Sequence, residues 1–366
     1  MSGTDILIVG GGVIGATLGW VLGKAGASVV LVDPGGVAER ASVGSLAWLN
    51  ASSTADMDYA RLRAASMRLW HEMAALHPDC PVTFPGAVMW GDDAEACAAQ
   101  VQRMATVGWP AEVLGRAAIS ARVPGLADVP EAALFAPGEG AAHPDQITDW
   151  MRDQARGAGC QVEQAWVAEI VVQDGARERP VAVVLDDGRR IEAAHIVVAA
   201  GNGCADLLAG LGIDLPMRRS AGILMRTGPV APVVPYVMAT PRLDFWQDAA
   251  GCVLMSSSLA KTPERADDLM ASDALAILTG MFPALAGAEV VETVRRDRPI
   301  PADGFPLVGA VGPKGLWVAA AHSGMTLAPA IAEALADEIL GREARFDLSH
   351  YPPLRGASSR QERAAL

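Results

Sequence analysis

The sequence predicts an α/β fold that begins with a parallel β-sheet. Two short apolar runs, residues 6–9 and 28–32, are typical of buried parallel strands. The stretch between them has helical character as far as Gly26, so the chain begins with a strand–helix–strand unit. Beyond Pro216 the pattern is again rich in strands, which indicates a second region built on a sheet.

The length and composition limit the classes of protein that fit. The 366 residues exceed the usual size of one domain, so we expect two interleaved domains or one elaborate domain. Hydrophobic residues make up 51% of the chain, which is enough to fill a large core. A formal net charge of −13 argues against nucleic acid or an anionic membrane surface as a partner.

The N-terminal region predicts neither export nor a membrane span. The chain starts without the basic stretch of a signal peptide. Residues 6–32 are apolar, but Lys24 and repeated glycines interrupt them, and their period changes from strand to helix and back. The five cysteines form no C-x-x-C pair, as expected of small buried residues in a reducing compartment. We therefore expect a cytoplasmic protein.

The turn after the first strand has the pattern G-x-G-x-x-G at Gly10, Gly12 and Gly15. Gly10 permits the tight turn, Gly12 lets the backbone approach a diphosphate, and Gly15 lets the helix pack closely on the strand. The helix N-terminus adds partial positive charge. Asp33, at the end of the second strand, can accept a hydrogen bond from a ribose hydroxyl. The motif predicts a Rossmann-like unit for NAD or FAD, and the alternative is a glycine-rich turn without a ligand.

The remaining elements are predicted from periodicity and from turn residues. Residues 110–124 have no regular pattern, and Asp187 with Gly188 gives a hairpin signal. Helical spacing occurs in residues 57–76, 94–107, 143–157 and 262–285. Strand patterns occur in residues 82–90, 167–173, 181–185, 189–192, 195–200, 221–226, 244–247 and 251–256.

Residues 315–329 combine a small apolar strand with the start of a helix. A polar turn, residues 322–326, separates the two. Because the first N–H groups of a helix have no partner within it, we expect this turn to present them to a ligand. The alternative is a surface helix whose first turn is capped by Ser323.

Four segments occur in a specific order, namely residues 10–33, 196–203, 298–309 and 315–329. In this order they resemble the FAD-dependent D-amino-acid oxidase family, which includes glycine oxidase, sarcosine oxidase and D-amino-acid dehydrogenases. The resemblance implies a Rossmann-like FAD-binding domain interleaved with a second domain, built on a largely antiparallel sheet, that covers the flavin. We expect the FAD-binding domain in residues 1–80, 143–218 and 296–366, and the substrate domain in residues 81–142 and 219–295.

The resemblance also implies one FAD, bound without a covalent link because no cysteine lies in the glycine motifs. Residues 41–48 differ from the commoner Ser-Gly-x-Asn-Ala-Gly form of the family, so an ordinary loop is the alternative there. A flavin that receives a hydride gains negative charge, which N–H groups at a helix start stabilise. The expected cofactor contacts, besides the glycine motif and Asp33, are Val13, Ile14, Pro34, Ser42, Ser45, Leu46, Val167, Ala200, Gly201, Gly324, Met325 and Thr326.

The family's reaction moves a hydride from a carbon that bears an amine to flavin N5, and the imine product then hydrolyses. Such a step depends on alignment more than on a dedicated acid or base. The resemblance gives Arg298 the role of binding the substrate carboxylate. The alternative is a surface arginine beside Arg295 and Arg296.

Three apolar residues, Trp48, Trp246 and Met255, are expected to form a wall around the substrate, with plain core packing as the alternative. His322 is the one histidine expected near the flavin. In sarcosine-oxidase-like enzymes a lysine over the flavin promotes the reaction with oxygen, and Met255 is predicted at that place. The electron acceptor is then oxygen, used slowly, or a quinone or dye.

The substrate predicted in this way is a small amino or imino acid, either a D-amino acid or an N-alkyl amino acid. Two alternatives stay open at this point. The substrate could be an amine that lacks a carboxylate. The chain could also be an FAD-carrying subunit of a larger dehydrogenase complex.

Overall fold

The computed structural model describes residues 4–35, 41–91, 93–172, 181–258 and 265–355. The predicted strand–helix–strand unit is present as β1 (Thr4–Val9), α1 (Val13–Lys24) and β2 (Val29–Asp33). β1 pairs in parallel with β2 on one side and with β12 (Arg190–Val198) on the other. Residues 6–9 of β1 and 29–32 of β2 are continuous apolar runs, because a central parallel strand is buried on both faces of its sheet.

Within the described residues the first sheet has eight strands. β9 (Gln161–Gln164) lies parallel to β2, and β19 (Leu316–Ala320) lies parallel to β12. The predicted hairpin signal joins β11 to β12 as an antiparallel pair. The antiparallel strands of this sheet are β10 (Val167–Val171), β11 (Val181–Leu185) and β18 (Leu307–Ala310).

The two faces of the first sheet are covered differently. Ile6 and Ile8 point to a core that is shared by five helices. These helices are α1, α2 (Met57–Leu76), α3 (Ala94–Thr106), α5 (Pro144–Gly157) and α8 (Gly324–Ile339). Leu7 and Val9 point to the opposite face, which packs against α6 (Gly203–Ala209). No helix in the described part of the chain combines the length and the hydropathy needed to cross a bilayer.

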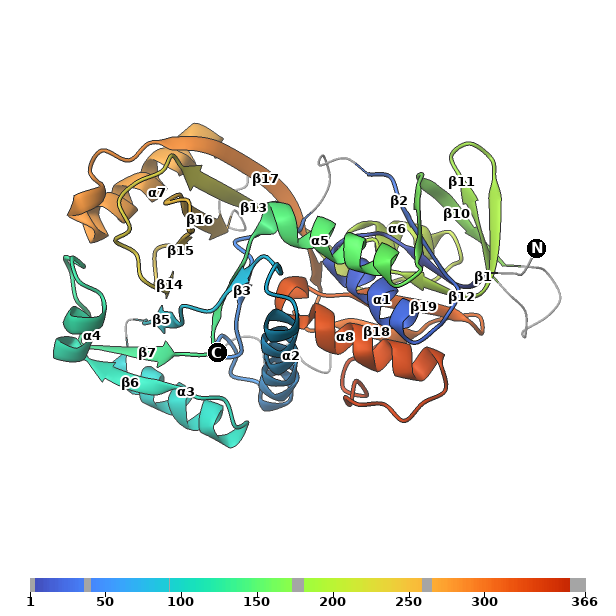
Figure 1. The fold of residues 1–366 in the computed structure, drawn as a ribbon, viewed down its shortest axis with the longest axis horizontal. Coiled ribbons are helices and arrows are strands. Elements are labelled where there is room, and N and C mark those ends of the chain that lie inside the picture. Colours follow the sequence, from blue (N-terminus) through green and yellow to red (C-terminus); the bar gives the residue numbers. More distant parts are fainter. Residues whose placement is uncertain (1–3, 36–40, 92, 173–180, 259–264, 356–366) are drawn as a thin grey trace.

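The second sheet lies at the other end of the molecule, and its long strands β13 and β17 reach towards the first sheet (Figure 1). Its neighbours are antiparallel except for the pair of β14 with β5. The strand order is β17 (Val290–Pro301), β13 (Met217–Thr227), β16 (Val253–Ser258), β15 (Asp244–Gln247), β14 (Val237–Ala239), β5 (Ala87–Met89), β7 (Ala132–Ala136) and β6 (Glu112–Gly115). The predicted combination of a Rossmann-like unit with a largely antiparallel sheet is therefore confirmed.

Successive residues of the second sheet face two different environments, because side chains alternate along a strand. The face that carries Gly222, Asp244 and Ser256 is called the inner face here, and these three residues line a cavity. The outer face carries Met225 and Met255, which pack in a separate core with α7 (Asp267–Met281).

A small third sheet and two short helical elements complete the described structure. The third sheet consists of β3 (Trp48–Leu49), β8 (Gly140–Ala142) and β4 (Val82–Thr83). The helical elements are α4 (Arg116–Arg122) and the 3-10 turn η1 (Pro283–Leu285).

Parts of the fold differ from the sequence prediction. Residues 110–124, predicted to be irregular, contain β6 and α4. Arg298 lies inside the twelve-residue strand β17, which the sequence analysis did not predict. β17 is an edge strand, so charged residues and Pro299 are tolerated in it and hide the usual alternation. β13 and β17 also run across the predicted domain boundaries, and that division stays a prediction.

Candidate active site

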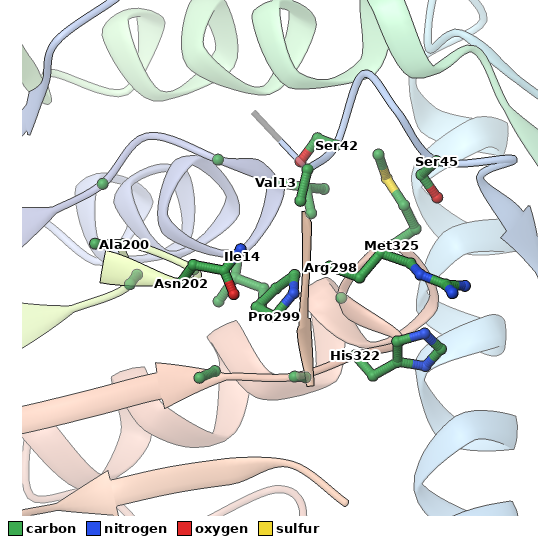
Figure 2. Close-up of a pocket in the computed structure, with 18 of the residues that line it drawn as sticks. Val13, Ile14, Ser42, Ser45, Ala200, Asn202, Arg298, Pro299, His322 and Met325 are labelled. Atoms are coloured by element: carbon green, nitrogen blue, oxygen red, sulfur yellow. The ribbon is translucent and has the colours of Figure 1, made fainter. Parts of the chain in front are cut away.

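A cavity of about 700 Å³ lies between the glycine turn after β1 and the inner face of the second sheet. Figure 2 shows Ala200 and Asn202 at one side of it and Arg298 with His322 at the other. The predicted residues that line the cavity are Gly10, Gly12, Val13, Ile14, Asp33, Pro34, Ser42, Ser45, Leu46, Trp48, Val167, Ala200, Gly201, Arg298, His322, Gly324, Met325 and Thr326.

The glycine turn leaves the cavity open above its backbone. Gly10 has a φ of 101°, and a Cβ atom there would lie 2.6 Å from the carbonyl oxygen of Ala199. A Cβ atom on Gly15 would lie 1.9 Å from the carbonyl oxygen of Gly10, so Gly15 serves helix packing and does not line the cavity. A Cβ atom on Gly12 would have Ser42 Oγ as its nearest neighbour, at 3.9 Å. Bulky ligand atoms can therefore approach the backbone at Gly12.

Asp33 is held next to this turn by a residue that the sequence analysis did not identify. Arg152 of α5 donates from Nη2 to Asp33 Oδ1 at 2.7 Å and from Nε to the carbonyl oxygen of Gly11 at 2.8 Å. The N–H of Gly11 donates to Asp33 Oδ2 at 2.7 Å. The Arg152 side chain is only 7% exposed, so the pair is desolvated and fixes the turn.

The segment that follows residue 41 passes over the cavity. Ser45 Oγ accepts a hydrogen bond from the N–H of Ala47, which has a left-handed φ of 54°. Trp246 Nε1 donates to the carbonyl oxygen of Leu46 at 3.0 Å. Trp246 is buried in the packing beneath this segment and does not line the cavity. The structure therefore does not bring Trp246 to the predicted substrate wall, whereas Trp48 does line it.

Arg63 of α2 is buried at the edge of the cavity and joins several segments. Its Nε donates to the carbonyl oxygen of Asn50 at 3.1 Å, and Nη2 donates to the side chains of Asn50 and Ser53. Nη1 donates to Ser323 Oγ at 2.8 Å. A signal was present in the sequence, because Tyr59, Arg63 and Ser66 share the apolar face of α2.

Glu139 fixes the same segment from the opposite side. Its Oε1 accepts hydrogen bonds from the N–H groups of Ala51 at 2.8 Å and Ser52 at 2.7 Å. Burial raises the pKa of the Glu139 carboxyl, although these donors and the charge of Arg63 act in the opposite direction. The chain around Asn50 is therefore held between a buried carboxyl group and a buried guanidinium group.

The start of α8 faces the cavity with its backbone. Gly324, Met325 and Thr326 line it, and no acceptor among the described residues takes up their N–H groups. The Ser323 side chain makes no hydrogen bond to the helix backbone. Thr326 Oγ1 instead donates to the carbonyl oxygen of Trp48 at 3.2 Å. These N–H groups can bind a polar or electron-rich edge of a ligand.

Arg298 stands on the inner face beside this helix start (Figure 2). A Cβ atom at position 222 would lie 2.8 Å from Arg298 Nε, so Gly222 provides the space for the guanidinium group. Burial lowers the pKa of Arg298, and the charge of Arg218 adds to this effect. Asn202 Nδ2 donates to the carbonyl oxygen of Asp297 at 2.8 Å and so ties β17 to the end of β12.

His322 is exposed to the cavity but surrounded by protein on its other sides. This burial, together with the charges of Arg298, Arg63 and Arg218, lowers the pKa of His322 to about 4. The imidazole is therefore neutral near neutral pH and can accept a hydrogen bond.

Met255 does not face the cavity, which corrects the prediction. It is fully buried in the core of the outer face, because the β16 residues on either side of it point inward. Ser256 is the β16 residue that lines the cavity. Asp244 of β15 lines it as well, and the sequence analysis did not identify this residue.

Comparison with known proteins assigns the family. The family model described as FAD dependent oxidoreductase matches residues 5–338. Glycine oxidase of Pseudomonas putida is 26% identical, and the alignment covers 95% of this chain and 98% of the relative. One of the subunits of opine oxidase from Rhizobium meliloti is 25% identical, with 95% and 96% covered. The structure of glycine oxidase from Geobacillus kaustophilus aligns with a TM-score of 0.83 at 23% identity, over 96% of this chain and 98% of that chain. The chain therefore belongs to the FAD-dependent oxidoreductase family.

Proposed function

We propose that the protein oxidises the carbon–nitrogen bond of an amino or imino acid, with a non-covalently bound FAD as hydride acceptor. The names of the relatives, which are a glycine oxidase and one chain of an opine oxidase, support an amino-acid substrate. The observation that carries the assignment is Arg298, a half-buried cation on the inner face beside the start of α8. A cation in this place fits a substrate that carries a carboxylate.

The residues that line the cavity fit FAD along its length. The glycine turn and the N-terminus of α1 would bind the diphosphate, and Asp33 would bind a ribose hydroxyl. The N–H groups of Gly324 and its two successors would bind the polar edge of the isoalloxazine. When bound, FAD supplies the hydride-accepting ring, and the protein supplies alignment and a polar environment.

Arg298 would hold the substrate by its carboxylate. A guanidinium group offers two parallel N–H donors that match the two oxygens of a carboxylate. Burial strengthens this pairing, because little water competes for the donors. The neutral His322 beside it can accept a hydrogen bond from the substrate and adds no further positive charge.

The proposal for the electron acceptor rests on the inner face of β16. Ser256, the residue of this strand that lines the cavity, provides no positive charge that would stabilise reduced oxygen. We therefore propose slow use of oxygen and faster transfer to a quinone or a dye.

An anaerobic screen tests the proposed function. The purified protein should release FAD into solution on acid precipitation, and its yellow colour should bleach with D-amino, L-amino or N-alkyl amino acids. Amines that lack the carboxylate serve as matched controls and should bleach it far more slowly. Recovery of NAD or FMN in place of FAD would contradict the cofactor assignment. Equal bleaching by the matched amines would favour the carboxylate-free alternative.

A second candidate function is that of an FAD-carrying subunit, which one relative favours because it is itself part of an oxidase with more than one kind of chain. In that case the purified chain would bind FAD and yet bleach with no amino acid until a partner chain was added.

A further inference from the structure

Asp244 is a carboxyl group on the inner face that the proposed function does not use. It lines the cavity together with Ser256, its partner residue on β16. The side chain is half-buried, and burial raises the pKa of Asp244 to about 6, with the N–H of Thr240 acting in the opposite direction. Among the described residues no ion pair involves Asp244, and no cationic side chain contributes to its pKa shift.

The strand register separates this carboxyl group from Arg298. Arg298 Nε lies over Gly222 of β13, because a Cβ atom there would be 2.8 Å away. Asp244 pairs with Ser256, which pairs with Leu224 of β13. Asp244 is therefore two strands and two residues from Gly222, or about 10 Å across the sheet and about 7 Å along it.

This separation determines which part of a substrate Asp244 can contact. An α-amino acid carries its amino and carboxylate groups on one carbon atom, so a molecule bound by Arg298 cannot place its α-amine at Asp244. A side chain several bonds long can span the gap. The cavity thus offers a cation at one point and a carboxyl group at a distant point of the same inner face.

Building on the proposed function, we propose that Asp244 selects substrates whose side chain ends in a cation, an ammonium or a guanidinium group, while Arg298 binds the carboxylate. A substrate of this kind supplies the counter-charge that the described residues of the protein do not place beside Asp244. A hydrogen-bonded ion pair inside a cavity is also stronger than the same pair in water. Neutral side chains of equal length would leave the carboxylate without a partner and bind less well.

The test compares matched substrates in the full-length protein with FAD bound. Arginine is compared with citrulline, in which a neutral urea group replaces the guanidinium, and lysine is compared with norleucine, in each case as both enantiomers. The rate and concentration dependence of anaerobic flavin bleaching are measured for the wild type and for Asp244→Asn. Asp268→Asn, an aspartate change at the start of α7, serves as the control.

We expect the wild type to prefer arginine over citrulline and lysine over norleucine. Asp244→Asn should lower kcat/KM for the cationic member of each pair by roughly 30-fold or more, and leave the neutral member within a few-fold. FAD content and thermal midpoint, measured in parallel, distinguish this loss from misfolding. Asp268→Asn should behave as the wild type does.

Three results would overturn the inference. If the wild type bleaches equally fast with both members of each pair, Asp244 has no role in selection, while the proposed amino-acid oxidation still stands. If Asp244→Asn slows the neutral and cationic members by the same factor, the residue is structural. If no amino acid of any class bleaches the flavin, the proposed function fails and the inference fails with it.

Discussion

Arg63 Nη1 donates a hydrogen bond to Ser323 Oγ over 2.8 Å, which joins the middle of α2 to the residue before α8. Ser323 Oγ makes this contact and no hydrogen bond to the first turn of α8. The N–H groups of that turn therefore stay directed at the cavity. The orientation of the helix start thus depends on a buried arginine more than 250 residues earlier in the chain.

Removing Arg63 should weaken both folding and FAD binding. Arg63→Ala leaves acceptors of Asn50, Ser53 and Ser323 without their donor, so we expect a loss of about 3 kcal/mol in unfolding free energy. Urea unfolding and FAD titration measure the two effects. Arg61→Ala, which breaks an exposed ion pair with Asp58 on the same helix, should change either quantity little. If Arg63→Ala and Arg61→Ala changed the unfolding free energy and FAD binding equally, the buried contacts of Arg63 would contribute nothing beyond an exposed ion pair.

The ion pairs of Arg152 provide an internal comparison. Arg152→Ala leaves Asp33 buried without its cation, and we expect a loss of about 3 kcal/mol in unfolding free energy together with weaker FAD binding. Asp149→Ala removes the other carboxylate partner of the same arginine, which is 65% exposed, and should cost at most about 1 kcal/mol. Unfolding by urea at several FAD concentrations tests both, and a larger effect of Asp149→Ala would contradict this account.

Acid should destabilise the FAD-free protein in part through His322. Its pKa in the folded state is about 4, below the usual value of 6.5, so between these values the unfolded chain binds a proton that the folded protein does not. The unfolding free energy should therefore fall as the pH is lowered from 6.5 towards 4. His322→Gln should make this fall shallower.

Asp244 changes its protonation over part of the same pH range, and its effect on the unfolding free energy has the opposite sign. Its pKa is raised to about 6, so the folded protein retains a proton that the unfolded chain has already lost. The comparison of His322→Gln with the wild type isolates the histidine, since Asp244 is present in both. An unchanged pH profile in His322→Gln would show that the histidine is not shifted in this way.

The N-terminal unit and the strand–turn–helix order of residues 315–329 were predictable because their signals are local. The glycine spacing of Gly10, Gly12 and Gly15 and the strand patterns around it fix a turn whatever the rest of the chain does. The polar turn predicted at residues 322–326 likewise lies between a strand and a helix, and the structure has this order, although α8 already begins at Gly324.

The inner face of the second sheet was harder to predict because it depends on strand register. A shift of one residue exchanges the two faces of a strand, and this shift separates the predicted Met255 from the observed Ser256. Arg63 and Arg152 are each a charge on the apolar face of a helix, which is a usable signal. Their partners, however, come from distant segments and become known only in the folded structure.

The measurement that tests the central claim most directly is anaerobic flavin bleaching in Arg298→Ala, compared between an amino acid and the amine that lacks its carboxylate. Loss of one partner of a buried charge pair typically costs about 2–5 kcal/mol, or about 30- to several-thousand-fold. We expect kcat/KM for the acid to fall by that order while FAD stays bound, and Arg298→Lys to recover only part of it, because a point charge replaces the two-pronged donor. Arg295→Ala, on the same strand but paired with Asp267 of α7, is the control and should keep the wild-type rate. Full activity of Arg298→Ala on its best acid substrate would contradict the account and favour an amine without a carboxylate as the substrate.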